Sequence, residues 1–149
     1  MSERIPVICV VDAVAVQNGK VVLIKRGIPP FENKLCLPGG HVDNVDFSAA
    51  HAAGRELFEE TTLLLRGNVF NFLTILDAPS RDPRMDARRI SIVYFAIVPP
   101  EISLDNLRAS SDAKEIVIRD INSLKKDEMG FDHWEAIKIL KLKLAFQNS

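Results

Sequence analysis

Three glutamates on one predicted helix, Glu56, Glu59 and Glu60, are the side chains of this sequence best suited to chemistry. On an α-helix Glu56 and Glu60 lie about 40° apart, and Glu59 lies about 60° to the other side of Glu56. Carboxylates this close repel one another, at a cost of about 0.2–0.5 kcal/mol for each pair. A cation such as Mg²⁺, which prefers carboxylate oxygens, water and phosphate, would relieve that repulsion. The pattern indicates either a metal site or a solvated acidic helix face.

The turn before this helix favours the metal site. Leu37 and Pro38 lead into Gly39 and Gly40, and paired glycines let a backbone come close to another group. A glycine loop that leads into a metal-bearing helix is suited to binding phosphate.

The helix itself is predicted over residues 48–61, because apolar residues up to Leu57 recur at spacings of three and four. Ser48 or Asp46 is expected to cap its start. Gly54, inside the pattern, costs about 1 kcal/mol relative to alanine.

Valine- and isoleucine-rich runs predict strands before, between and after two helices. A hairpin is expected where Asn18-Gly19 separates two such runs, because both residues tolerate positive φ. A closing amphipathic helix is predicted over residues 131–146 from the helical spacing of its apolar residues. The predicted strands cover residues 5–16, 21–24, 35–37, 69–76, 90–98 and 115–118. This order indicates a mixed α/β or α+β layered domain.

Length and composition indicate one globular domain over residues 1–149, with 47% hydrophobic residues. The net charge of −1 argues against a generic nucleic-acid or anionic-membrane binder, which would be more basic. Residues 1–6 lack the features of a signal peptide, and the apolar run over residues 7–16 is too short to cross a bilayer. Cys9 and Cys36 lie in apolar stretches and are expected to be buried thiols. A cytoplasmic protein is therefore expected.

Residues 40–63 resemble the signature of the Nudix hydrolase family, G-x5-E-x7-R-E-U-x-E-E-x-G-U, in which U is a bulky apolar residue. The matching residues are Gly40 at the start, Arg55-Glu56-Leu57 and Glu59-Glu60 at the centre, and Leu63 at the end. This combination is far more specific than a lone glycine motif.

Three positions depart from that signature. Its first glutamate falls on Asp46, a shorter carboxylate, and its last glycine falls on Thr62. The gap from Asp46 to Arg55 is eight residues instead of seven, so one residue is inserted before or early in the helix. All three glutamates remain, and the metal site is expected to survive.

The resemblance implies the Nudix fold, an αβα sandwich with a mixed sheet between helices. It also implies that Glu56, Glu59, Glu60 and Gly40 hold Mg²⁺, with Mn²⁺ as an alternative, while water attacks a phosphorus of a nucleoside diphosphate derivative. Family members differ in which glutamate serves as the base, so Glu59 and Glu115 are both candidates. A homodimer is expected from the family resemblance alone.

Over nearly the whole span of residues 10–140 the chain resembles the ADP-ribose pyrophosphatase branch of this family. The segments that carry the likeness are Lys25-Arg26-Gly27, Pro30-Phe31, Leu37 to Asp43, Arg81-Asp82-Pro83-Arg84, Ser91 to Phe95 and Phe131-Asp132-His133. The likeness implies that Arg26, His41, Arg81 and Arg84 contact the substrate.

An arginine-rich loop near the middle of the chain has two interpretations. Its arginines fall within nine residues and are Arg81, Arg84, Arg88 and Arg89. Guanidinium groups suit phosphate oxygens, which favours a substrate-binding role. The same arginines could instead pair with Asp82 and Asp86 in a solvated loop.

The main functional interpretation is an Mg²⁺-dependent pyrophosphohydrolase that cleaves ADP-ribose-like nucleoside diphosphate derivatives to AMP and ribose 5-phosphate. The alternatives are a hydrolase of nucleoside triphosphates and a binding module that senses a nucleotide sugar without cutting it. The inserted residue and Thr62 favour the binding module, whereas the three intact glutamates favour an enzyme. No nucleic-acid or membrane partner is expected.

Overall fold

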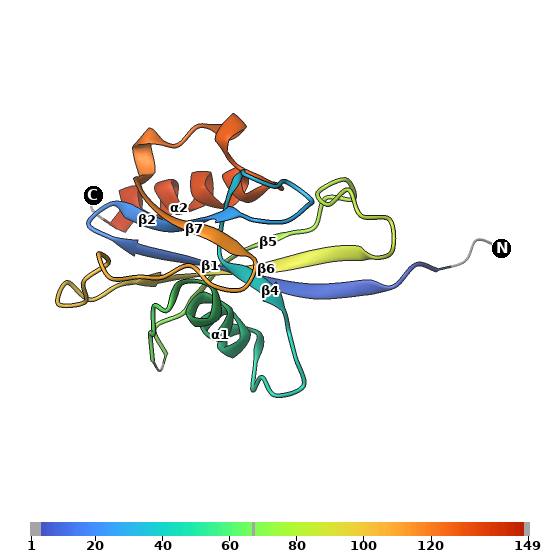
Figure 1. Cartoon of the computed structure of the whole chain (residues 1–149), viewed down its shortest axis with the longest axis horizontal. Helices are drawn as coiled ribbons and strands as arrows, with labels where there is room; N and C mark the ends of the chain where they lie inside the picture. The colour runs from blue at the N-terminus through green and yellow to red at the C-terminus, as the bar shows by residue number, and fades with distance from the viewer. Residues whose placement is uncertain (1–3, 67, 148–149) are drawn as a thin grey trace.

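The computed structural model describes residues 4–66 and 68–147, so the first half of the segment considered as a signal peptide lies outside it (Figure 1). The elements in chain order are β1 (Val7–Gln17), β2 (Lys20–Arg26), β3 (Leu35–Cys36), β4 (Gly39–His41), α1 (Ala49–Thr61), β5 (Asn71–Leu76), β6 (Arg88–Ile97), β7 (Ala113–Asp120), the 3₁₀ turns η1 (Ile121–Ser123) and η2 (Lys126–Glu128), and α2 (His133–Gln147). The predicted hairpin and both predicted helices are confirmed, with ends that differ by one or two residues.

A seven-stranded mixed sheet runs through the middle of the molecule, in the order β3-β2-β1-β6-β5, with β4 paired to β1 and β7 paired to β2. The central pair, β1 and β6, is parallel over ten residue pairs, from Val7 with Arg88 to Val16 with Ile97. All other strand pairs are antiparallel.

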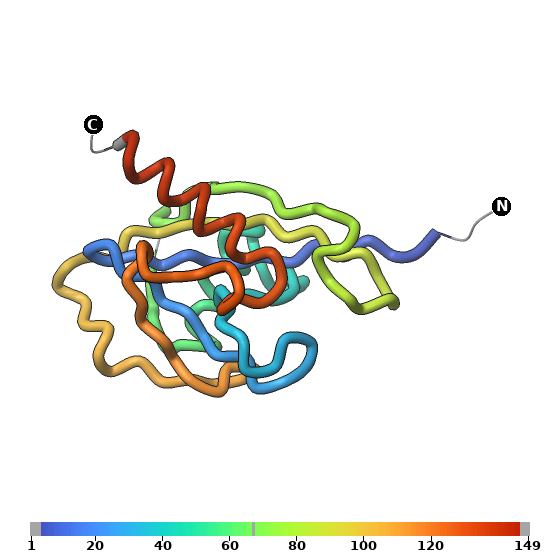
Figure 2. The backbone as a smooth tube through the Cα atoms, turned by 90° about the horizontal axis from the view of Figure 1, so that it is seen from above, coloured from blue at the N-terminus to red at the C-terminus, as the bar shows by residue number. Residues whose placement is uncertain are grey.

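The two helices cover opposite faces of this sheet, α1 below and α2 above in the view of Figure 1. Seen from above, α2 runs obliquely across the strands (Figure 2). The predicted sandwich of a mixed sheet between helices is therefore confirmed. Among the described residues, no helix is long and apolar enough to cross a membrane.

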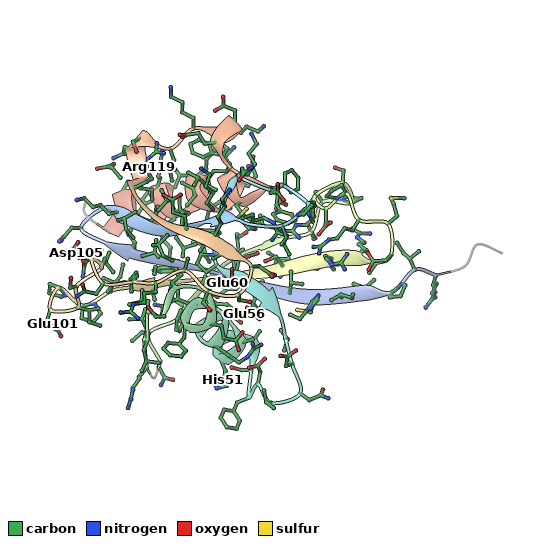
Figure 3. The ribbon with its side chains drawn as sticks, viewed as in Figure 1. His51, Glu56, Glu60, Glu101, Asp105 and Arg119 are labelled. Atoms are coloured by element: carbon green, nitrogen blue, oxygen red, sulfur yellow. The ribbon has the colours of Figure 1, made fainter. Side chains whose placement is uncertain are left out.

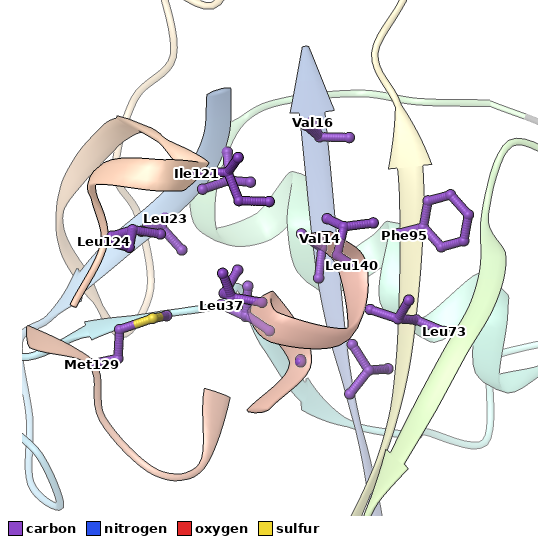
Figure 4. Close-up of a cluster of buried hydrophobic side chains, with 14 of the residues drawn as sticks. Val14, Val16, Leu23, Leu37, Leu73, Phe95, Ile121, Leu124, Met129 and Leu140 are labelled. Carbon is purple, nitrogen blue, oxygen red and sulfur yellow. The ribbon is translucent and has the colours of Figure 1, made fainter. Parts of the chain in front are cut away.

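Alternation along β1 divides the core into two clusters, because successive side chains of a strand point to opposite faces. Val14 and Val16 pack toward α2 in a cluster that also holds Leu37, Phe95 and Leu140 (Figure 4). Val11, Ala13 and Ala15 of β1 pack toward α1, in a cluster that also holds Ala52 and Leu57 of that helix. These clusters fix the positions of both helices relative to the central strands.

Local chemistry sets the ends of α1. Ser48 caps its start by accepting a hydrogen bond from the His51 amide, so the predicted serine cap is confirmed. Thr62 ends the helix in the left-handed conformation, with φ of 64°, the backbone state that glycine adopts most easily. Gly54 is explained by tight packing, since an added Cβ would lie 3.0 Å from the Phe70 ring.

Two expectations from the sequence were wrong. Gly39 and Gly40 belong to the short strand β4, whereas a turn was expected. Cys9 is exposed, although its apolar surroundings predicted a buried thiol, while Cys36 is buried as expected. The first residues of β1 run past the end of α1, so this part of the strand has no helix over it (Figure 1), and Val7 is 63% exposed.

Candidate active site

A cleft of about 340 Å³ lies where β1 and β4 meet α1, the loop after β5 and the start of α2. Carboxylates of α1 line it together with guanidinium groups from the loop after β5. Of the residues predicted as site residues, the cleft contains Arg26, Gly40, His41, Glu56, Glu59, Glu60, Arg81 and Arg84. Such a cleft suits a ligand that carries both metal-binding and anionic groups.

Glu60 is the most enclosed carboxylate of the cleft, with only 3% of the residue exposed. Its Oε1 accepts a hydrogen bond of 3.0 Å from the Gly39 amide. Burial raises the pKa of Glu60 to about 8, and the charges of Glu56, Asp12 and Asp112 add to that rise. A buried carboxyl group crowded by other carboxylates is a group that an added cation would stabilise.

Glu56 and Glu59 share one cation, Arg55. Arg55 Nη1 lies 3.1 Å from Oε1 of each of them. Burial raises the pKa of Glu56, and the neighbouring Arg55 opposes that rise. Figure 3 shows Glu56 and Glu60 between α1 and the sheet, whereas His51 lies on the side of α1 away from the sheet. The three glutamates therefore differ in environment although they share one helix face.

The departure at Asp46 leaves its carboxylate bound to α1. Arg55 donates to both Asp46 oxygens, from Nε and from Nη2, at 2.9 Å each. The Asp43 amide donates to Asp46 Oδ2 at 2.8 Å. These bonds, with that of Arg55 first, hold the pKa of Asp46 well below its usual range.

Both glycines of β4 lie too close to neighbouring groups for a Cβ to fit in this arrangement, and at Gly40 the neighbour is the flexible end of the Glu56 side chain. An added Cβ on Gly40 would overlap the Glu56 carboxylate, and one on Gly39 would overlap Asp12 Oδ1 and the Val11 carbonyl oxygen. The sequence analysis expected the paired glycines to permit a close approach. The groups that approach them here are the carboxylates themselves.

The oxygen donors at this position fit a hard divalent cation such as Mg²⁺ or Mn²⁺. Among the described residues, no three His, Cys, Asp or Glu side chains already converge as ligands of one metal. Arg55 draws Glu56 and Glu59 toward itself, and the Gly39 amide holds Glu60. The carboxylates thus lie close together and are chemically suited to binding a metal ion. Arg55 and the Gly39 amide hold them at present, and a cation would have to replace these groups.

The arginine-rich loop has features of both interpretations, substrate binding and pairing with acidic side chains. Arg84 pairs with Asp82, and Arg89 pairs with Asp86. Arg84 and Arg89 nevertheless line the cleft, and Arg89 Nε is buried without a hydrogen-bond partner among the described residues. Arg88 lies outside the cleft and donates to the Asp77 carbonyl oxygen.

Phe131 is a cleft residue that the sequence analysis did not single out for binding. The guanidinium carbons of Arg26 and Arg81 lie 5.2 and 6.0 Å from its ring centre. Arg26 also donates to the carbonyl oxygens of Ile28 and Pro30, so much of its hydrogen-bonding capacity serves its own loop. The only signal for Phe131 was its place in the segment of residues 131–133.

The structure does not bring Glu115 into the cleft. Glu115 is exposed on β7, where it pairs with Lys25 of β2. Asp112, just before this strand, lines the cleft instead. Sequence reasoning missed Asp112, which precedes the strand that was predicted. The pairing of β7 with β2 is irregular nearby, with a register shift between Lys25 and Arg26.

Comparison with known proteins gives the family. The sequence profile of the NUDIX domain matches residues 7–139. The chain belongs to the NUDIX family. Nudix hydrolases use divalent metal ions, which agrees with the oxygen donors of α1.

Three relatives are similar to this chain over most of its length. An ADP-ribose pyrophosphatase of Methanocaldococcus jannaschii is 37% identical over 128 residues, which cover 86% of this chain and 69% of that protein. A MutT/nudix family protein of Listeria innocua has 32% identity and a TM-score of 0.74, over 97% of this chain and 98% of that one.

The third relative is a bifunctional NMN adenylyltransferase/ADP-ribose pyrophosphatase of Francisella tularensis, solved with AMP and a manganese ion. It has 28% identity and a TM-score of 0.81. The match covers 95% of this chain but only 43% of the Francisella protein, so this chain spans less than half of that relative's length.

Proposed function

We propose that this protein is a metal-dependent pyrophosphohydrolase that cleaves ADP-ribose-like nucleoside diphosphate derivatives to AMP and ribose 5-phosphate. The observation that carries this proposal is the cleft in which the carboxylates of α1 and the arginines after β5 line one space. The names of the Methanocaldococcus and Francisella relatives support ADP-ribose as the substrate.

The two halves of the cleft have separate tasks in this proposal. Glu56, Glu59, Glu60 and the Gly40 carbonyl would hold Mg²⁺ or Mn²⁺, which when bound stabilises the negative charge that develops on the diphosphate. Arg84 would bind phosphate oxygens as a charged fork in place of Asp82. The protein thereby fixes the diphosphate at both ends before the reaction.

Glu59 is the base in this proposal, because its side chain is 47% exposed and lines the cleft. It accepts a proton from the attacking water as the new oxygen–phosphorus bond forms. The phosphoanhydride bond breaks at the same phosphorus, and its bridging oxygen leaves on the other phosphate. Arg55, 3.1 Å from Glu59, keeps this carboxylate oriented.

Chromatography of the products tests the reaction. The protein is incubated with ADP-ribose with and without Mg²⁺, beside Glu60→Gln and a control, Glu128→Gln, which lies outside the cleft. AMP that forms only with metal, survives Glu128→Gln and is lost in Glu60→Gln supports the proposal. Intact ADP-ribose in every reaction contradicts it. A triphosphate with a higher kcat/KM, or tight binding without cleavage, would establish one of the two alternatives.

The oligomeric state of the protein and its location in the cell are still predictions. A homodimer is expected from the family, and analytical ultracentrifugation of the purified protein measures it directly. The cytoplasmic location predicted from the sequence is tested by fractionation of the cells that make the protein.

A further inference from the structure

Residues 131–133, at the start of α2, contact both halves of the cleft. The family resemblance pointed to this tripeptide, and the reaction proposed above gives it no role. Phe131 lines the cleft, Asp132 is hydrogen-bonded to Arg81, and His133 is hydrogen-bonded to the Leu37 backbone. Each contact leads to a different part of the site.

His133 supports the chain that leads into β4. Its Nδ1 accepts a hydrogen bond of 3.0 Å from the Leu37 amide. That bond assigns the ring proton to Nε2, which lies 3.3 Å from Asp12 Oδ2. Ser91 Oγ donates to the same Asp12 oxygen at 2.5 Å. His133, Asp12 and Ser91 are all more than nine-tenths buried, and burial strengthens the polar contacts between them. His133 and Asp12 also line the cleft.

The segment held by His133 leads directly to the carboxylates of α1. Three consecutive residues each have one backbone group fixed by a different element. His133 of α2 accepts from the Leu37 amide, the Ala13 amide of β1 donates to the Pro38 carbonyl oxygen at 2.8 Å, and Glu60 of α1 accepts from the Gly39 amide at 3.0 Å. A shift at Leu37 would therefore move the amide that holds Glu60.

Asp132, the residue before His133, supports the side of the cleft that arginines line. Asp132 accepts from Arg81 Nη2 at 2.9 Å and from Arg81 Nε at 3.1 Å. Arg81 is 7% exposed, and its guanidinium lies above the Phe131 ring. The Arg81 side chain therefore takes its position from α2.

We propose that His133 and Asp132 are positioning residues. Through them, the start of α2 fixes the position of the metal-binding carboxylates relative to the arginine-rich loop. His133 acts on Glu60 through the backbone of residues Leu37 to Gly39. Asp132 acts on the arginine-rich loop through Arg81. Both halves rest on the proposed function: the metal half needs only its metal site, whereas the substrate half also needs its substrate.

Binding of Mn²⁺, measured by the electron paramagnetic resonance of the free ion without substrate, tests the metal half. Outer-shell partners of metal ligands commonly contribute 10–100-fold to affinity. We expect Mn²⁺ to bind about tenfold or more weakly to His133→Ala and to His133→Gln, which lack an acceptor at the Nδ1 position. His133→Asn keeps an acceptor there and is expected to stay within about threefold of the unmodified protein. Equal affinities for the Asn and Ala variants would overturn the proposal.

Two measurements separate positioning from general loss of stability. Ile137→Val perturbs the buried packing of α2 but leaves the hydrogen bond between His133 and Leu37 unchanged. We expect it to lower the free energy of unfolding by about 0.5–1.5 kcal/mol. We expect its Mn²⁺ affinity to be unchanged, and a loss equal to that of His133→Gln would overturn the proposal. The nitrogen chemical shifts of His133 in the unmodified protein need no variant. They must show an unprotonated Nδ1, and a protonated Nδ1 would also overturn it.

The substrate half is tested with Asp132→Asn. We expect its KM for ADP-ribose to rise about tenfold while Mn²⁺ affinity stays unchanged, which is the reverse of the effect of His133→Gln. An unchanged KM, or weaker Mn²⁺ binding, contradicts the role of Asp132. If the unmodified protein does not cleave ADP-ribose, the proposed function fails, yet the order of Mn²⁺ affinities among the His133 variants still decides the metal half.

Discussion

Arg55 holds the Asp46 carboxylate with two nitrogens, Nε and Nη2, each 2.9 Å from one oxygen. The bond closes the loop before α1 onto the helix that carries the catalytic glutamates of the proposed reaction. The loop is one residue longer than the family signature and the side chain is one methylene shorter. The Arg55–Asp46 pair forms despite both departures.

Asp46→Asn is expected to weaken Mn²⁺ binding about tenfold. The neutral amide cannot retain Arg55, which is then free to compete with the metal for Glu56 and Glu59. Asp46→Glu restores the residue of the signature but not the length of its loop, so we expect an affinity between those of the other two proteins. Titration calorimetry measures all three, and an Asp46→Asn protein that binds Mn²⁺ normally would contradict this explanation.

The stability of the metal-free protein should fall as the pH rises. Glu60 has a pKa of about 8 in the folded protein against 4.5 for the ordinary side chain, so the folded state binds the extra proton. Its contribution is complete below pH 4.5 and is lost as the pH passes through 8, with a slope of at most about 1.4 kcal/mol per pH unit. Urea unfolding at several pH values between 5 and 9 measures this slope.

Glu60→Gln is the matched control for that slope, because it keeps a neutral group in the same place. We expect its unfolding free energy to depend less on pH over the same range. A variant with the same slope as the unmodified protein would assign the effect to other groups.

Metal binding should release a proton near neutral pH. Glu60 is largely protonated below its pKa of about 8, and the proton must leave before the carboxylate can bind a cation. Calorimetry of Mg²⁺ binding at pH 7, in two buffers with different ionisation enthalpies, is expected to report close to one proton per metal. The number should fall toward zero above pH 9, and a value near zero at pH 7 would show that Glu60 is already ionised.

Asp112→Asn should lower activity more than Glu115→Gln does. Asp112 lines the cleft and acts electrostatically on Glu60, whereas Glu115 is exposed on β7 opposite Lys25. We expect at least a tenfold loss of kcat for Asp112→Asn and less than a twofold change for Glu115→Gln. The reverse order in steady-state kinetics would restore Glu115 as the candidate base.

Arg84→Ala should raise the KM for ADP-ribose about tenfold, because one guanidinium of the cleft is lost. Arg88→Ala removes an equal charge from the end of the same arginine-rich segment, at the first residue of β6 and outside the cleft. We expect it to leave KM within twofold. Similar effects of both substitutions would show that the loop acts only through its overall charge.

Local pattern was enough to predict the parts of the fold that depend on neighbours in the chain. Asn18 and Gly19 have positive φ values of 51° and 73°, as their hairpin required. The spacing of the three glutamates on α1 likewise follows from helix geometry alone, and all three line the cleft. These features need no knowledge of the rest of the molecule.

The remaining features depend on pairing between distant segments. Strand β4 exists because Gly39 and Gly40 pair with β1, and two glycines carry no strand signal of their own. Asp112 rather than Glu115 lines the cleft, and it lies just before β7, next to an irregular register between β2 and β7. His133 was predicted only as part of the last helix and of a segment that carries the family likeness, and its bond to the Leu37 amide joins residues 96 positions apart.

The parallel pairing of β1 with β6 has a consequence for how the protein acquires its site. Ten residues of β1 lie beside the residues 81 positions later, from Val7 with Arg88 to Val16 with Ile97. The chain must therefore close a long loop before its central strands can meet, and such distant contacts slow folding. That loop contains α1 and the first arginines of the cleft, while His133 arrives only with the last helix. During synthesis the carboxylates, Arg55 and the Gly39 amide are thus made well before His133, so a chain that ends before α2 lacks the group that fixes Leu37.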